Sequence, residues 1–134
     1  MTAVRRRYVE GRFGQVHARI AQPDRDCGKR PLLLIHMSPM TGRIFEALAG
    51  EMGDDRLSVA FDTPGYGQSD APDTQPSIET YAAALGEAME ALAPDGPFDI
   101  LGYHTGSLTA TALAALSPGR VGRLVLIGAP LFSP

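Results

Sequence analysis

The order of apolar and polar positions along the chain predicts an alternation of strands and helices. Near the N-terminus, Val16, Ala18 and Ile20 alternate with polar residues, which is the period of a half-buried antiparallel strand. Residues 4–10 and 14–21 are therefore expected to form two extended segments on either side of a glycine-containing turn.

After this pair the pattern changes to short, continuous apolar runs. Such runs are typical of strands that are covered on both faces of a sheet. Four strands are expected from them, over residues 32–35, 57–61, 98–101 and 124–127.

Helices are expected between these strands. Thr41 is placed to cap a short first helix, with Ile44, Phe45 and Leu48 on its inner face. Ser77 is placed to cap a longer second helix. Its apolar residues recur at three- and four-residue spacing and make one stripe: Ile78, Tyr81, Ala82, Leu85, Met89 and Leu92.

A third helix is expected over residues 107–116. Two antiparallel strands followed by strand–helix alternation predict an α/β fold of three layers, α/β/α. Its sheet is expected to be mostly parallel, with an antiparallel N-terminal strand pair. Chemistry in such sheets lies at the carboxyl ends of the strands, so the turns after the four apolar runs are the candidate sites.

The composition narrows the class of protein. A length of 134 residues, 44% of them hydrophobic and 20% charged, suits one ordinary globular domain. The net charge of −3 does not indicate a nucleic-acid partner, and no stretch approaches the roughly 20 apolar residues that cross a membrane. Residues 1–30 hold eight of the twelve basic residues, interpreted as a solvated face: Arg5, Arg6, Arg7, Arg12, Arg19, Arg25, Lys29 and Arg30.

Cysteine and histidine usage bears on location and cofactors. Cys27 is the single cysteine and lies in a polar run, so it is expected to be a loop thiol in a cytoplasmic protein. His17, His36 and His104 lack the spacing of metal ligands, and no glycine-rich dinucleotide fingerprint follows residues 32–35. We expect no metal and no cofactor, and a small molecule as the substrate or ligand.

The turn after residues 32–35 is expected to orient backbone N–H groups. Met37 and Ser38 lie where the chain leads from a strand toward a helix, and N–H groups there can face a developing negative charge. We interpret His36 as a histidine that bonds to nearby backbone. In the next such turn, Asp62 and Asp70 are expected to cap backbone N–H groups rather than to act as a catalytic pair.

The turn after residues 98–101 has the spacing of a strained strand-to-helix turn. Gly102 and Gly106 lie two residues before and two residues after His104. This spacing pushes the central side chain out at the top of the sheet, with a helix N-terminus behind it. The pattern is G-x-S-x-G with histidine in the position of the serine.

Three motifs in this order resemble the α/β-hydrolase superfamily. Residues 32–39 resemble its strand and H-G-x-P oxyanion loop, residues 62–69 its D-x-P-G-x-G-x-S turn, and residues 101–106 its nucleophile elbow. The similarity covers nearly the whole chain. It implies oxyanion N–H groups from Ser38 and Thr105, and it puts His104 at the nucleophile position.

The sequence departs from the family pattern at three points. Met37 replaces a glycine of the oxyanion loop, and His104 replaces the nucleophile. The acid and the general-base histidine of the family follow later strands, and neither His17 nor His36 lies where that histidine would be. The chain is therefore expected to be the N-terminal half of the domain (residues 1–134 of a truncated α/β-hydrolase fold), without the lid and without a complete catalytic set.

Three functions remain open for the site. The first is a hydrolase acting on a small ester, amide or related carbonyl substrate, in which a neutral imidazole forms an acyl-imidazole. The second is a noncatalytic ligand-binding pseudoenzyme or a truncated gene product. The third is a cofactor-independent lyase or an oxygenase-like relative that uses His104 as acid or base. Because the strand Leu124 to Ile127 is expected at a sheet edge, we also predict self-association through it.

Overall fold

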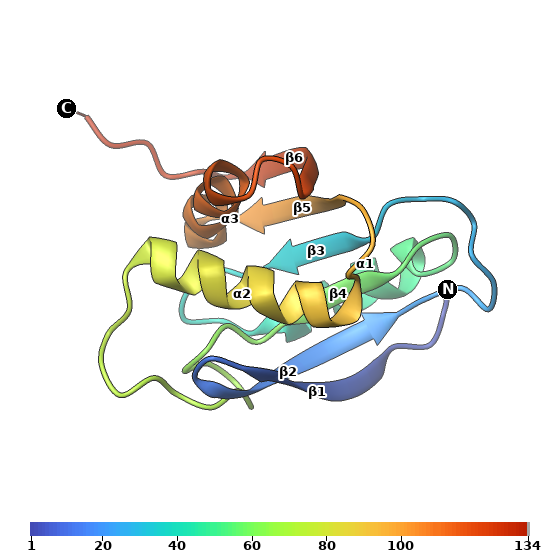
Figure 1. The fold of residues 1–134 in the computed structure, drawn as a ribbon, viewed down its shortest axis with the longest axis horizontal. Coiled ribbons are helices and arrows are strands. Elements are labelled where there is room, and N and C mark those ends of the chain that lie inside the picture. The colour runs from blue at the N-terminus through green and yellow to red at the C-terminus, as the bar shows by residue number, and fades with distance from the viewer. Residues whose placement is uncertain (134) are drawn as a thin grey trace.

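The computed structural model describes residues 1–133, and the strands within that range form one six-stranded sheet in the order β1-β2-β4-β3-β5-β6 (Figure 1). β1 and β2 pair antiparallel, as do β2 and β4, whereas β3 pairs parallel with both β4 and β5, and β6 pairs parallel with β5. The predicted parallel sheet with an antiparallel N-terminal pair is confirmed. The strands are β1 (Arg5–Gly11), β2 (Gly14–Ala21), β3 (Leu32–Ile35), β4 (Ser58–Phe61), β5 (Phe98–Tyr103) and β6 (Val121–Ile127).

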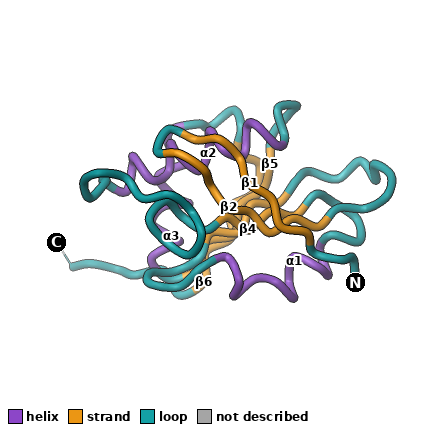
Figure 2. The backbone as a smooth tube through the Cα atoms, turned by 90° about the horizontal axis from the view of Figure 1, so that it is seen from below, coloured by secondary structure: helices purple, strands orange, loops and turns teal. Residues whose placement is uncertain are grey.

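Helices cover both faces of the sheet, so the predicted three layers are confirmed. α1 (Glu46–Met52) lies on one face, and α2 (Ile78–Leu92) and α3 (Thr105–Leu116) lie on the other (Figure 2). Because successive strand residues point to opposite faces, β3 contributes to two cores. Leu33 and Ile35 pack toward α2 and α3, whereas Leu32 and Leu34 pack toward α1.

The two predicted helix caps are present. The Thr41 hydroxyl accepts a hydrogen bond from the Arg43 N–H at 3.3 Å, and the Ser77 hydroxyl accepts one from the Thr80 N–H at 3.1 Å. Each satisfies a backbone donor that the first turn of a helix leaves without an intrahelical partner.

The prediction for the inner face of the first helix was wrong at two residues. Ile44 and Leu48 are each 37% exposed, whereas Phe45 and Ala49 are buried. The chain enters α1 through the 3₁₀ turn η1 (Gly42–Phe45), which is wound more tightly than an α-helix. Because the winding changes from 3₁₀ to α after Phe45, the residues that face the core do not follow the purely α-helical spacing that the sequence prediction assumed.

The prediction that residues 14–21 form a half-buried strand, with its polar residues exposed, was also wrong. Every residue of β2 from Val16 to Ala21 is buried, including His17 and Arg19. β2 lies inside the sheet, between β1 and β4, and Asp62 next to β4 supplies a partner for both basic side chains. A solvated face was therefore the wrong interpretation for Arg19.

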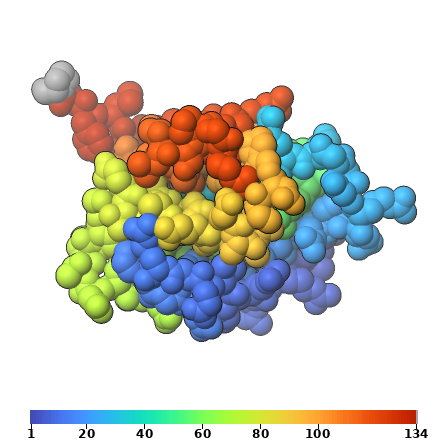
Figure 3. All heavy atoms as spheres, in the orientation of Figure 1, coloured from blue at the N-terminus to red at the C-terminus, as the bar shows by residue number. Residues whose placement is uncertain are grey.

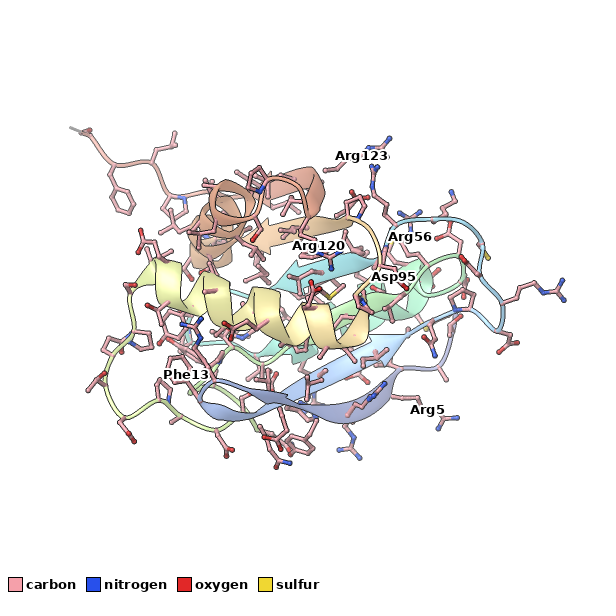
Figure 4. The ribbon with its side chains drawn as sticks, in the orientation of Figure 1. Arg5, Phe13, Arg56, Asp95, Arg120 and Arg123 are labelled. Carbon is pink, nitrogen blue, oxygen red and sulfur yellow. The ribbon has the colours of Figure 1, made fainter. Side chains whose placement is uncertain are left out.

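The N-terminal arginines on β1 agree with a solvated face. Arg5, Arg6 and Arg7 are exposed, and Figure 4 shows Arg5 extending away from the body of the molecule. The Arg120 side chain, in contrast, is held against the body of the molecule. Its guanidinium donates to the Ala93 carbonyl at 2.6 Å, at the C-terminal end of α2 (Figure 4).

β6 forms the outer strand of the described sheet next to β5. It begins at Val121, three residues before the predicted start, because its pairing with β5 already begins at Phe98 and Val121. The side chains from Leu124 to Ile127 are 37–47% exposed. Figure 3 shows the end of the described chain, after β6 and up to residue 133, projecting from one corner of the molecule. Within residues 1–133, the helices are all too short or too polar to cross a membrane.

Candidate active site

A single residue, His104, separates β5 from α3. Its backbone has φ 52° and ψ −119°, and it is the one residue other than glycine with positive φ in the described part of the chain. Such a conformation costs about 1–3 kcal/mol and persists only where surrounding structure enforces it. Here the His104 N–H donates to the Ile127 carbonyl at 2.9 Å, and the Ser107 N–H donates to the His104 carbonyl at 2.8 Å. The imidazole is exposed.

The glycines around this turn lie where a side chain has no space. A Cβ on Gly102 would lie 2.6 Å from the Gly106 carbonyl oxygen, and a Cβ on Gly106 would lie 2.4 Å from the Ile35 carbonyl oxygen. The start of α3 is therefore pressed against the end of β3. The helix begins at Thr105, directly after the positive-φ residue His104 and two residues before the start expected from the sequence.

Ser38 and Thr105 meet across this contact. The backbone N–H of Ser38 donates to the Thr105 hydroxyl at 2.7 Å, although the two residues lie 67 positions apart in the chain. The Ser38 hydroxyl lies 2.9 Å from the Tyr66 hydroxyl. The structure thus brings Ser38 to Thr105, the residue that directly follows His104. The three site residues expected from the sequence therefore lie at one end of the sheet, where β3 and β5 point in Figure 1.

His36 joins the loop after β3 to the turn after β4. Its Nδ1–H donates to the Met37 carbonyl at 2.8 Å, and its Nε2 accepts a hydrogen bond from the Thr63 N–H at 3.0 Å. Burial lowers the pKa of His36, because the charged form loses hydration that the neutral form does not need. The prediction that this histidine bonds to nearby backbone is confirmed, and its contacts require the neutral ring protonated at Nδ1.

Asp62 is a backbone cap, as expected, and the centre of a buried charge cluster as well. Its carboxylate accepts from the Gly42 N–H at 2.9 Å and from the Gln68 N–H at 3.0 Å. It also accepts from the Arg19 guanidinium at 3.1 Å and from the His17 Nδ1–H at 3.0 Å. Because Asp62 is 1% exposed, removing the Arg19 guanidinium would leave its carboxylate buried without that cationic partner.

This cluster was missed from the sequence, although a signal for it was present. His17 and Arg19 lie two residues apart on a strand, so their side chains point to the same face. The antiparallel pairing of Ala18 with Phe61 then puts that face beside Asp62. The cluster positions the two loops that lead away from β3 and β4, one through Gly42 and one through Gln68.

A small cavity of about 190 Å³ lies beside Ser38 and Thr105. A larger hollow of about 480 Å³ lies between α2 and α3, but it includes Phe98 and Arg120, at the amino ends of β5 and β6. The smaller cavity is the one at the carboxyl ends of the strands, where open α/β sheets bind their ligands. Its lining residues are His36, Ser38, Thr63, Tyr66, Gln75, Ile78, Tyr81, Thr105, Gly106, Leu108 and Thr109.

The fold and this arrangement of turns define a class of protein, and comparison with known proteins identifies the same class. Residues 30–134 match the family described as alpha/beta hydrolase fold, and the chain belongs to this family.

Two curated relatives and one solved structure illustrate the similarity. A non-heme chloroperoxidase of Streptomyces lividans is 40% identical over 72 residues, 53% of this chain. An esterase of Mycobacterium tuberculosis is 31% identical over 97 residues, 72% of this chain. The crystal structure of the N-acyl homoserine lactonase AidH superposes over 96% of this chain with a TM-score of 0.83 and 27% identity.

These relatives are longer than the matched region. The match spans 26% of the chloroperoxidase, 32% of the esterase and 46% of the lactonase chain. The chain thus corresponds to less than half of each of these proteins.

Proposed function

We propose that this chain is part of a hydrolase that acts on a small ester, amide or related carbonyl substrate, with His104 at the nucleophile position. The observation that carries the proposal is the backbone of His104, which has positive φ in the one-residue turn between β5 and α3. Strain of this kind concentrates at functional sites, and here it exposes the imidazole at the carboxyl end of the sheet. The similarity to an esterase and to an N-acyl homoserine lactonase supports an ester-like substrate.

The donors for an oxyanion are the backbone N–H groups of Ser38 and Thr105. Thr105 is the first residue of α3, so its N–H is among those without an intrahelical partner. The Ser38 N–H points at the Thr105 side chain. An oxyanion that displaced the Thr105 hydroxyl would have both donors available, in the manner of the fixed dipoles that stabilise acyl-transfer intermediates.

The proposed chemistry is acyl transfer through His104. An unprotonated imidazole nitrogen forms a bond to the carbonyl carbon, and the carbonyl oxygen becomes the oxyanion. The C=O bond then re-forms as the bond to the alkoxide breaks, and the alkoxide departs as an alcohol with the proton that the other ring nitrogen releases through water, which leaves a neutral acyl-imidazole. Water attacks the acyl-imidazole, releases the carboxylic acid and regenerates the imidazole.

A second role for His104 follows from its surroundings. Within residues 1–133 its imidazole makes no hydrogen bond to another side chain, so nothing in that range holds it as one half of a nucleophile–base pair. The same exposed ring can remove a proton from a bound carbonyl compound, as in a cofactor-independent lyase or oxygenase-like relative. Binding without turnover would instead indicate a pseudoenzyme.

The cytoplasm remains the proposed location, supported by the single Cys27.

Release of nitrophenolate from p-nitrophenyl acetate tests the proposal. Because the exposed thiol of Cys27 can also attack an ester, all proteins carry Cys27→Ala. We expect His104→Ala to lower the rate at least about tenfold, and mass spectrometry to find an acetyl group on His104 in the parent.

Lys29→Ala is the matched control, since it removes an exposed amine, also a potential nucleophile toward an ester, that lies outside the cavity beside Ser38 and Thr105. It should leave the rate within about twofold. Equal rates with and without His104 would remove this residue from the mechanism.

A further inference from the structure

Three consecutive arginines on β1 carry charges that no carboxylate of the described chain neutralises. Arg5, Arg6 and Arg7 are all exposed, and none of them forms an ion pair within residues 1–133. By contrast, the Arg19 guanidinium on the neighbouring strand β2 binds the Asp62 carboxylate at 3.1 Å. The three guanidinium groups of β1 are therefore available to an anionic partner.

β1 is also the outermost strand on its side of the sheet. It pairs with β2 alone, and Figure 1 shows it along the lower rim of the molecule. Its outer side presents backbone N–H and C=O groups to which an extended chain can add as a further strand. Charged side chains on such an edge oppose pairing with a like-charged or apolar strand. Positive charges do not oppose an acidic strand, so the arginines select which kind of strand can add.

The arginines reach both faces of the sheet and still line one common space. Because side chains alternate along a strand, Arg5 and Arg7 point to the same face as Val9, which packs in the core with α2. Arg6 points to the other face. All three line a hollow of about 850 Å³. An extended peptide has side chains that alternate in the same way, so a strand added here can meet all three guanidinium groups. A membrane or a nucleic acid offers no backbone that pairs with a strand.

The hollow keeps a positive charge although two carboxylates also line it. Asp54 is occupied by the N-terminal amine of Met1 at 3.2 Å and by the Thr2 hydroxyl at 2.7 Å. Asp24 is exposed and is the second carboxylate. The other lining residues, apart from the three arginines, are uncharged. Three guanidinium groups therefore face one carboxylate that is not already held by a cation, and the surplus favours an acidic partner.

We propose that the outer edge of β1 docks an extended acidic peptide segment as a further strand of the sheet. The backbone of that segment pairs with β1, and three consecutive carboxylates face Arg5, Arg6 and Arg7 as cross-strand pairs of opposite charge. In the strand order, β2, β4 and β3 separate β1 from β5, the strand that leads to His104. The docking surface is thus separate from the candidate active site and does not depend on its chemistry.

Two fluorescein-labelled peptides test the proposal on the 134-residue chain. One has three consecutive glutamates between threonines, and the other has glutamines in their place. Fluorescence polarisation measures both dissociation constants. We expect the glutamate peptide to bind about tenfold more tightly, the preference that three cross-strand pairs of opposite charge supply together. The combined variant Arg5→Gln, Arg6→Gln and Arg7→Gln should bind the two peptides equally.

The matched control removes the same charge elsewhere. Arg25→Gln, Arg43→Gln and Arg123→Gln are combined, because these arginines are also exposed but do not line the hollow. This variant should keep the preference for the glutamate peptide. Hydrogen exchange followed by NMR tests the strand addition itself. Exchange of the outward-facing amides of β1 should slow when the glutamate peptide binds, because each gains a backbone acceptor.

Four results would overturn the proposal. Wild-type protein that binds both peptides equally would remove the charge selection, and a preference that survives the variant of the β1 arginines would place it elsewhere. A preference lost equally in the control would reduce it to net charge. Binding of phosphatidylserine vesicles or of a DNA oligonucleotide without binding of the glutamate peptide, or unchanged exchange of the β1 amides in the bound state, would exclude an added strand.

Discussion

The backbone N–H of Ser38 donates to the hydroxyl of Thr105 at 2.7 Å, so a side chain of the protein occupies a donor that we assign to the oxyanion. Replacing Thr105 by valine keeps the shape of the side chain and removes the acceptor. We expect the Ser38 amide to exchange with deuterium about fivefold faster, since a typical net hydrogen bond contributes about 1 kcal/mol. Hydrogen exchange followed by NMR measures this directly.

Thr105→Ser is the control for that exchange experiment, because it retains the hydroxyl and should retain most of the protection. An unchanged exchange rate in Thr105→Val would mean that the Ser38 N–H is protected by something other than the Thr105 side chain.

The contact between α3 and β3 predicts a large difference between two glycine substitutions. Gly106→Ala puts a Cβ 2.4 Å from the Ile35 carbonyl oxygen, whereas nothing lies within 4 Å of a Cβ on Gly119. We expect Gly106→Ala to lower the free energy of unfolding by about 2 kcal/mol or more, and Gly119→Ala to change it by less than about 0.5 kcal/mol. Urea denaturation of both variants measures the difference. Similar stabilities would contradict the close packing of this turn.

Burial of His36 predicts a dependence of stability on pH. Its pKa in the folded state lies below the ordinary histidine value of about 6.5, so just below pH 6.5 the unfolded state binds more protons than the folded state. The contribution to stability is therefore complete above pH 6.5 and is lost as the pH falls. We expect the free energy of unfolding to decline from pH 7 to pH 5.5, and less steeply in His36→Gln.

Urea titrations at several pH values give the slope of the free energy of unfolding against pH, for the wild type and for His36→Gln. Between pH 8 and pH 9 His36 is neutral in both the folded and the unfolded state of the wild type, so its slope there should match that of the variant. Parallel slopes below pH 6.5 would mean that His36 titrates alike in both states.

The exposed edge of β6 predicts self-association of the isolated 134-residue chain. Leu124, Val125, Leu126 and Ile127 lie on the outer strand of the described sheet and are all more than a third exposed. An apolar edge strand presents unpaired backbone groups to another copy, and a lysine on such an edge opposes pairing. We expect sedimentation at micromolar concentration to show dimers or larger species, and Val125→Lys to shift them to monomer. A monomeric wild type would refute this proposal.

The sequence by itself determined the local features of this protein. The apolar runs identified β3 and β4 because a strand buried on both faces needs mostly apolar residues, and the same signal identified β6, although its side chains are exposed in the described sheet. Thr41 and Ser77 were recognisable as caps because each acts on an N–H only two or three residues away. The glycines around His104 were likewise visible, since a tight turn depends on the residues within it.

Only the tertiary structure decided which distant residues meet. Arg19 and Asp62 are 43 positions apart, and Ser38 and Thr105 are 67 apart. Neither contact can therefore be predicted from the spacing of residues along the chain. The strand order puts β2 inside the sheet and buries Arg19, although its alternating pattern is that of a half-exposed strand. Burial of a charge depends on whether a partner is folded beside it, and that partner is chosen by the topology of the whole sheet.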